Sequence, residues 1–193
     1  MKQDIILAGV GGQGILSIAF VIDKAALKEG LQIKQAEVHG MSQRGGAVQS
    51  HLRLSRGPIW SDLIPKGRAD LILSVEPLES LRYLDYLDPA GQLITSATPF
   101  VNIPDYPPLE KVLEDLRKGG NTVVVDSDRL AKEAGSSKAQ NIVMLGAASN
   151  RLMLETANLE EVIRKLFEPR GESLVAMNLK AFALGREAAR AAA

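Results

Sequence analysis

The chain contains no cysteine, and this absence excludes several kinds of chemistry. Because none of its 193 residues carries a thiol, the chain forms no disulfide, offers no thiolate nucleophile and cannot ligate an iron–sulfur cluster through its own sulfur. Aromatic residues make up only 4% of the chain, and 23 basic residues are balanced by 23 acidic ones. Without a basic excess or aromatics for stacking, nucleic acid is not an expected partner.

Long apolar runs are missing as well. No stretch reaches the roughly 20 apolar residues that a membrane helix needs, so no membrane association is expected. The charged start at Met1–Asp4 precedes an apolar run that is too short for a secretory signal. The hydrophobic content of 46% is typical of globular proteins. We therefore expect one cytoplasmic domain over residues 1–193.

Strand and helix patterns alternate along the first two thirds of the chain. Apolar and β-branched runs predict strands at 3–9, 31–36, 47–54, 70–75, 92–95 and 122–125, and helical spacing predicts helices at 15–28, from Glu76-Pro77, from Leu109 and at 126–134. From residue 139 onward the pattern is helical throughout. This order predicts a Rossmann-like three-layer α/β fold, with a mostly parallel sheet, helices on both faces and a helical C-terminal third.

Several side chains and short segments have specific expected roles. His51 falls on the polar face of the 47–54 strand, which predicts a surface or interface position. The segment Asp88–Gly91 predicts a turn. Asn158 and Glu161 resemble a helix-capping pair. Asn178 falls on the apolar face of the last helix, where a buried amide needs partners, and we expect it to tie that helix to a neighbouring loop.

The first of two glycine-rich stretches lies between the first strand and the first helix. Gly9, Gly11 and Gly14 fit the G-x-G-x-x-G pattern, and Glu37 lies 23 residues past Gly14, where a ribose-binding acid is expected. The unpaired N–H groups and dipole of a helix start favour a phosphate there. The alternative is that these glycines only let strand and helix pack closely. The stretch is not a P-loop, because Ile15-Leu16 replaces the required Lys and Ser/Thr.

The second stretch, His39–Gly46, places His39, Ser42, Gln43 and Arg44 on a loop rich in glycine. We interpret it as a contact loop for an anionic ligand or a partner's active site; the alternative is a loop whose polar side chains bond its own backbone. Both stretches follow a strand, so both are expected at the carboxyl edge of the sheet, where ligands of such sheets bind.

The histidines do not predict a catalytic or metal site. His39 and His51, even with Glu37, have poor spacing for a metal. Ser42 with His39 lacks the surroundings of a nucleophile elbow. No catalytic residue and no metal ligand is therefore predicted on this chain.

Five segments together resemble a known family: Gly9–Gly14, Glu37–Gly46, Ala69–Glu79, Asn141–Ala147 and Asn178–Gly185. They are similar to the gamma domain of 2-oxoacid:ferredoxin oxidoreductases, and most similar to the beta subunits of the indolepyruvate type. The resemblance implies an accessory subunit of an enzyme that cleaves 2-oxo acids with coenzyme A, making acyl-CoA and CO2 and reducing ferredoxin. It implies thiamine diphosphate, magnesium and iron–sulfur clusters on a larger alpha subunit, and no cofactor on this chain.

The resemblance leads to a hypothesis about the loops. Arg44, with backbone N–H groups of Gly45, Gly46 and the turn formed by Gly11, Gly12, Gln13 and Gly14, is expected to form an anion-accepting rim that completes the partner's active site or coenzyme A pocket. The anion is a substrate carboxylate, a coenzyme A phosphate or an acidic side chain of the partner. Two other hypotheses remain open: a free-standing oxidoreductase binding NAD(P) or FAD, and a non-catalytic assembly subunit.

Overall fold

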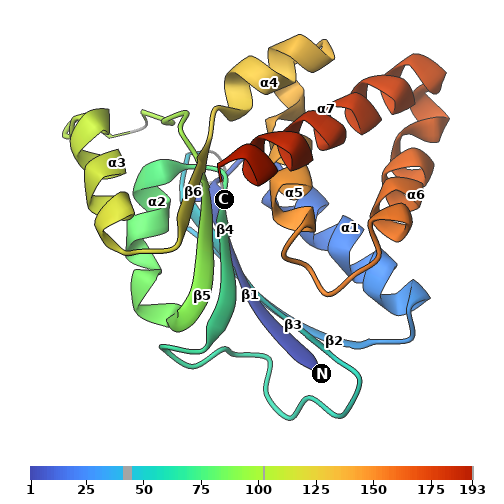
Figure 1. Ribbon diagram of the computed structural model, residues 1–193, viewed down its shortest axis with the longest axis horizontal. Helices are drawn as coiled ribbons and strands as arrows, with labels where there is room; N and C mark the ends of the chain where they lie inside the picture. The colour runs from blue at the N-terminus through green and yellow to red at the C-terminus, as the bar shows by residue number, and fades with distance from the viewer. Residues whose placement is uncertain (41–44, 102, 193) are drawn as a thin grey trace.

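The computed structural model describes residues 1–40, 45–101 and 103–192, and Figure 1 shows how their elements are arranged. The described strands are Lys2–Val10 (β1), Gln32–His39 (β2), Ala47–Ser55 (β3), Ala69–Ser74 (β4), Leu87–Ser96 (β5) and Thr122–Val125 (β6). They form one sheet in the order β2-β3-β1-β4-β5-β6. β1, β4, β5 and β6 are parallel neighbours, whereas β3 is antiparallel to both β1 and β2. The predicted mostly parallel sheet is confirmed.

Helices cover both faces of this sheet (Figure 1). The described helices are Ile15–Lys28 (α1), Pro77–Arg82 (α2), Leu109–Lys118 (α3), Ser127–Ala134 (α4), Gln140–Ser149 (α5), Thr156–Phe167 (α6) and Glu172–Ala191 (α7). α2 and α3 lie on one side and α1 with α4–α7 on the other, so the three layers and the helical last third are confirmed. No helix within the described ranges has the length and apolarity needed to cross a membrane.

Strand alternation divides the apolar residues between two cores. Ile5 and Leu7 of β1 belong to the core under α1, α5 and α7, whereas Ile6 belongs to the core under α3. Leu71 and Ile72 of β4 divide in the same way. Successive side chains of a strand point to opposite faces, so a strand buried on both faces is apolar throughout, and each of these side chains contributes roughly 1.5–3 kcal/mol by leaving water.

Two glycines bring α5 and α7 into close contact. A Cβ added to Gly146 would lie 2.0 Å from the carbonyl oxygen of Phe182, and one added to Gly185 would lie 1.9 Å from that of Val143. No larger residue fits at either position without moving a helix. This contact fixes α5, and α5 in turn supplies residues to the cleft described below.

The sequence located most elements, and the helix predicted at 15–28 matches α1, with Gly30 in a left-handed conformation just beyond it. The turn predicted at Asp88–Gly91 is wrong: these residues lie inside β5, where its register against β4 shifts. Gly91 is needed there because an added Cβ would lie 2.7 Å from the carbonyl oxygen of Ala69.

Two predicted roles for asparagines are also wrong. Glu155, not Asn158, stands at the start of α6, and the Asn158 amide instead donates to Oε1 of Glu29 beyond α1 at 2.9 Å. The Asn178 amide donates to the carbonyl oxygen of Leu174 within its own helix at 2.8 Å, so it does not tie α7 to a loop. The partner of Asn158 is thus distant in sequence and fixed by packing, whereas that of Asn178 lies one turn earlier in its own helix.

Candidate functional site

The turn between β1 and α1 is built on glycines in left-handed conformations. Gly12 has φ +100° and Gly14 has φ +79°, values that disfavour residues with a Cβ. Gly14 also lies against Asn141 of α5, because an added Cβ would lie 2.5 Å from the Asn141 Nδ2 atom. The Asn141 amide faces the Gly14 carbonyl oxygen at 3.4 Å. The turn is therefore held between the sheet and α5.

Gln13 braces this turn from within. Its Oε1 accepts from the Val10 N–H at 2.8 Å, and its Nε2 lies 3.5 Å from the carbonyl oxygen of Val75, just beyond β4. The Gln13 amide thus bridges the ends of two parallel strands. Its polar atoms already have protein partners, which favours a structural role for Gln13 beside the ligand contact that the sequence predicts.

The two glycine-rich stretches meet through their backbones. The Gly11 N–H donates to the Gly46 carbonyl oxygen at 2.8 Å, and the Gly45 N–H donates to the Gly11 carbonyl oxygen at 3.4 Å. Both stretches therefore lie at the same rim of the sheet, as predicted. His39 ends β2 opposite Val48, while the predicted contact residues Ser42, Gln43 and Arg44 lie outside the described residues.

Some backbone N–H groups of the turn remain available to a ligand. Those of Gly11, Gln13 and Gly45 donate to protein acceptors. The N–H groups of Gly12 and Gly14, like those of the first helical residues 15 and 16, find no acceptor within the described ranges. Among the described residues, the amides at the β1–α1 turn without a backbone acceptor are thus those of Gly12, Gly14 and the helix start, where the helix dipole adds positive partial charge.

A cleft of about 490 Å³ opens beside these amides. Four parts of the chain far apart in sequence line it: the β1–α1 turn, the residue after β4, the segment after β5 and residues 137–141 around the start of α5. The lining residues are Gly12, Gln13, Gly14, Val75, Thr98, Pro99, Phe100, Ser137, Lys138, Gln140 and Asn141. Lys138 is exposed and adds a cation. Backbone amides at a helix start and a lysine cation lining the same cleft suit an anionic group.

The opposite wall is positioned by Glu76, which is buried at 1% exposure. Its Oε1 accepts from the Phe100 N–H at 3.2 Å and from the Tyr106 hydroxyl at 2.5 Å, and its Oε2 accepts from the Glu79 N–H at 2.7 Å. Burial and the hydrogen bond to Glu76 raise the pKa of Tyr106. One carboxylate thus caps α2 and holds the loop that carries Phe100.

Glu37 is not placed to serve this cleft. It lies on β2, and β3 separates β2 from β1 in the sheet. In a dinucleotide-binding sheet the ribose-binding acid ends the strand next to the first one. Here two strand spacings, about 10 Å, lie between them. This topology disfavours the dinucleotide hypothesis.

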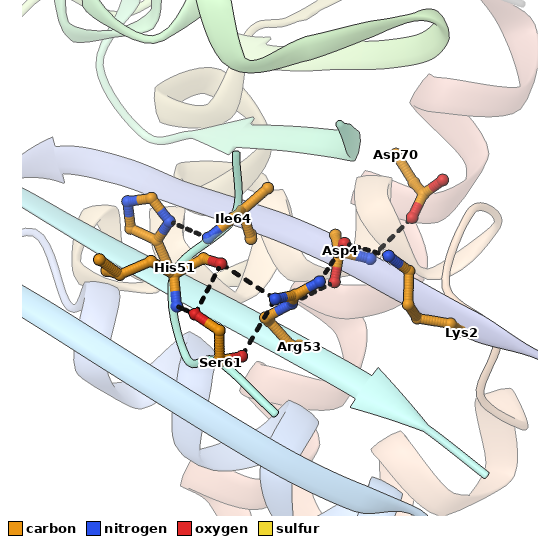
Figure 2. Close-up of polar contacts among 8 residues, drawn as sticks. Lys2, Asp4, His51, Arg53, Ser61, Ile64 and Asp70 are labelled. Atoms are coloured by element: carbon orange, nitrogen blue, oxygen red, sulfur yellow. Dashed lines mark hydrogen bonds and ion pairs between the residues drawn. The ribbon is translucent and has the colours of Figure 1, made fainter. Parts of the chain in front are cut away.

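The prediction that His51 lies at the surface is wrong. His51 is only 4% exposed, because the segment after β3 covers the polar face of that strand. Its Nδ1 accepts from the Ile64 N–H at 3.0 Å (Figure 2), and its ring meets Tyr86 edge-on, with 5.4 Å between centroids. Burial, with the nearby Arg53 charge, lowers the pKa of His51. His51 is thus a neutral structural acceptor.

Sequence reasoning missed several cleft residues. No sequence motif includes four of them, and the order of the strands in the sheet brings them to the cleft: Thr98, Pro99, Phe100 and Lys138. Phe100 is 41% exposed beside Val101 at 70%, and this apolar pair in a proline-rich loop was the available signal. Asn141 stood inside a segment of the family resemblance without an assigned role.

Comparison with known proteins identifies close relatives. Residues 4–188 match the protein family described as pyruvate ferredoxin/flavodoxin oxidoreductase. The chain is 38% identical to the indolepyruvate oxidoreductase subunit IorB of Pyrococcus horikoshii, over 98% of both chains. It is 27% identical to the gamma subunit of a keto/oxoacid ferredoxin oxidoreductase from Geobacter sulfurreducens, with a TM-score of 0.69 over 98% of this chain and 99% of that one.

A further solved structure shares the fold. The chain superposes with a TM-score of 0.78 on the 2-oxoglutarate:ferredoxin oxidoreductase of Magnetococcus marinus, at 24% identity. The match covers 98% of this chain but only 31% of that polypeptide. In that protein the fold described above is one part of a much longer chain.

Proposed function

Because the chain belongs to the pyruvate ferredoxin/flavodoxin oxidoreductase family, we propose that it is the accessory subunit of a cytoplasmic enzyme that decarboxylates 2-oxo acids oxidatively. The enzyme uses coenzyme A, forms acyl-CoA and CO2, and reduces ferredoxin. The relative from Pyrococcus horikoshii favours the indolepyruvate type, in which the substrates are aryl pyruvates. The accessory subunit is inactive alone and acts with a larger alpha subunit.

The residues of this chain do not fit the cofactors of such an enzyme. The sequence has no cysteine to ligate an iron–sulfur cluster. Within the described ranges, no three His, Asp or Glu side chains gather closely enough to hold a metal ion. We therefore assign thiamine diphosphate, magnesium and the clusters to the larger subunit, and no redox or carbanion step to this chain.

What the chain contributes is an anion-binding wall. The observation that carries this proposal is the pair of hydrogen bonds joining Gly11 to Gly46 and Gly45 to Gly11, because they place the second glycine-rich stretch beside the turn whose residues Gly12, Gln13 and Gly14 line the cleft. Gly12, Gly14 and the exposed Lys138 line this cleft together. Preorganised donors of this kind bind and orient an anion without reorganising. An accessory subunit can contribute such donors to the active site of a catalytic subunit.

Two anions fit this wall: a phosphate of coenzyme A and the carboxylate of the 2-oxo acid. The decisive experiment reconstitutes the complex with Lys138→Gln and, separately, Arg44→Ala, and measures KM for each substrate. A hydrogen bond to a charged group contributes about 1.5–3 kcal/mol. We discount this for the exposed Lys138 and expect KM for one of the two substrates to rise roughly 3- to 10-fold, with kcat nearly unchanged.

Lys118→Gln is the matched control, since Lys118 is an exposed lysine on α3 paired with Asp115 at 2.6 Å and far from the cleft. It should leave both KM values at wild type. If Lys138→Gln and Arg44→Ala also leave both KM values unchanged while weakening the complex, the anion role is wrong and the chain is an assembly subunit.

A further inference from the structure

Among the described residues, the most exposed large apolar side chain lies far from the cleft. Trp60, the single tryptophan of the sequence, is 90% exposed, and Leu63 is 57% exposed. Both belong to the β3–β4 loop, residues 56–68. Isolated exposed apolar residues are ordinary, but here an almost fully exposed tryptophan and an exposed leucine lie three residues apart on one loop. Tryptophan is also the residue type most enriched at the energetic centre of protein interfaces.

The fold holds this loop in place from below. The Arg53 Nη1 atom donates to the carbonyl oxygens of Ser61 at 3.0 Å and Leu63 at 2.9 Å. The Ile64 N–H donates to His51, and the Ile64 side chain is buried in the core under α3. Figure 2 shows Arg53 and His51 reaching from β3 toward the loop. The backbone that follows Trp60 is thus held by Arg53 at Ser61 and Leu63, and by His51 at Ile64.

Arg53 is itself fixed by a buried partner. Its Nε and Nη2 atoms donate to the two oxygens of Asp4 at 2.8 and 3.0 Å, and Asp4 is fully buried (Figure 2). The Asp4 N–H in turn donates to Asp70 at 2.7 Å. A buried ion pair adds little net stability compared with apolar residues of the same size. What this pair does provide is a guanidinium aimed at two loop carbonyls.

The loop lies at the end of the sheet opposite the cleft. β3 ends at Ser55, opposite Lys2 at the start of β1, whereas the glycine turn follows the end of β1. In Figure 1 the β3–β4 loop lies at the bottom beside the N-terminus. A contact made through Trp60 is therefore separate from the anion-binding wall.

We propose that Trp60 and Leu63 are a preorganised anchor by which this chain docks onto the larger subunit, an inference that rests on the proposed function. A loop already fixed in its bound shape loses little conformational entropy on association. The anchor fits an apolar pocket with a carbonyl or carboxylate at its end to accept the indole N–H. Two side chains supply only part of the roughly 800 Å² that each partner buries in a stable interface.

The larger subunit is the expected occupant for two reasons. The relatives that match along their whole length are subunits, and in the Magnetococcus marinus protein this fold is joined to a much larger polypeptide. A symmetric contact between two copies would need Trp60 to meet a self-complementary surface. The charged residues that flank the anchor, Arg56, Asp62 and Lys66, offer a second Trp60 no apolar pocket.

The test uses the tryptophan as its own reporter. Because the chain has one tryptophan, labelling it with 5-fluorotryptophan gives a single ¹⁹F resonance that reports Trp60 alone. Unlabelled larger subunit is added, and complex formation is followed independently by analytical ultracentrifugation. We expect the resonance to shift and lose its sensitivity to a dissolved paramagnetic quencher in the complex. We also expect Trp60→Ala to raise the Kd of the complex at least 30-fold.

Leu63→Ser and Leu27→Ser form a matched pair, since both leucines are 57% exposed and Leu27 lies on α1. Only Leu63→Ser should weaken the complex. The proposal is overturned if the complex forms with an unchanged ¹⁹F resonance, or if the resonance moves with the chain's own concentration and so reports a second copy. If no complex forms with wild-type chain, the proposed function fails first, and the anchor fails with it.

Discussion

Replacing Gly14 by alanine should weaken the fold more than replacing Gly30, although both glycines have left-handed backbones at the ends of the same helix. At Gly30, with φ +70°, an added Cβ would meet nothing within 4 Å. At Gly14, with φ +79°, it would lie 2.5 Å from Asn141 Nδ2. Gly30→Ala therefore measures backbone strain alone, while Gly14→Ala measures the same strain plus a collision.

The magnitudes follow from these two terms. A left-handed alanine costs about 1–2 kcal/mol, and the reduced entropy of the unfolded chain affects both variants equally. Displacing the Asn141 amide adds about 1 kcal/mol, through an off-rotamer side chain. We expect a loss of about 1–2 kcal/mol in the free energy of unfolding for Gly30→Ala and about 2–3 kcal/mol for Gly14→Ala.

Urea denaturation at neutral pH measures both losses, provided that the slope m is unchanged. The double variant Gly14→Ala with Asn141→Ala isolates the collision, because removing the amide gives the new methyl group room. We expect it to recover about 1 kcal/mol relative to the sum of the single variants. If Gly14→Ala costs no more than Gly30→Ala, or if the two sites are additive, the proposed contact between the turn and α5 is wrong.

Three further predictions concern the rest of the fold. Gly185→Ala should cost several kcal/mol in thermal or urea unfolding, because its Cβ would lie 1.9 Å from the Val143 carbonyl oxygen and force α5 and α7 apart; a cost below 1 kcal/mol would contradict the close contact. Because burial lowers the pKa of His51 from 6.5, the folded state binds fewer protons at this residue, so the contribution of His51 to the free energy of unfolding should be level above pH 6.5 and fall below it. His51→Gln should remove that decline, and a pH profile parallel to wild type would refute the assignment. Burial raises the pKa of Asp23 from 3.8 to about 6, so its charged form opposes folding above pH 6. Asp23→Asn should therefore stabilise the chain at pH 7.5 but not below pH 3.8. Equal effects on the free energy of unfolding at both pH values would contradict the raised pKa of Asp23.

Local signals predicted local structure well. The limits of α1 follow from a glycine turn before it and Gly30 after it, and the start of α2 follows from Pro77, with Glu76 as its cap. At the start of α4, residue type allows either Asp126 or Ser127 as the cap, and the structure has Asp126, whose side chain accepts from the Arg129 N–H at 3.1 Å. These features depend on neighbours in sequence, which a pattern can read.

Features that depend on distant neighbours could not be read in this way. The alternation of apolar and polar residues in β3 does not indicate that this strand lies between β1 and β2. The distance of Glu37 from the first strand could therefore not be predicted. The same strand pattern placed His51 on a polar face, but the loop that covers this face is fixed by Arg53 and Asp4, which are far apart in sequence. The cleft could not be predicted for the same reason, because four separate segments line it.

The two hydrogen bonds that join Gly11 to Gly46 and to Gly45 have a consequence for interpreting mutations. Each stretch supplies a hydrogen-bond donor to the other. A substitution that moves the backbone of one stretch should therefore also move the backbone of the other. Kinetic defects from changes on the two sides should therefore overlap rather than add. When a single variant in one stretch changes the kinetics, a variant in the other stretch has to be measured as well before a chemical role is assigned to either.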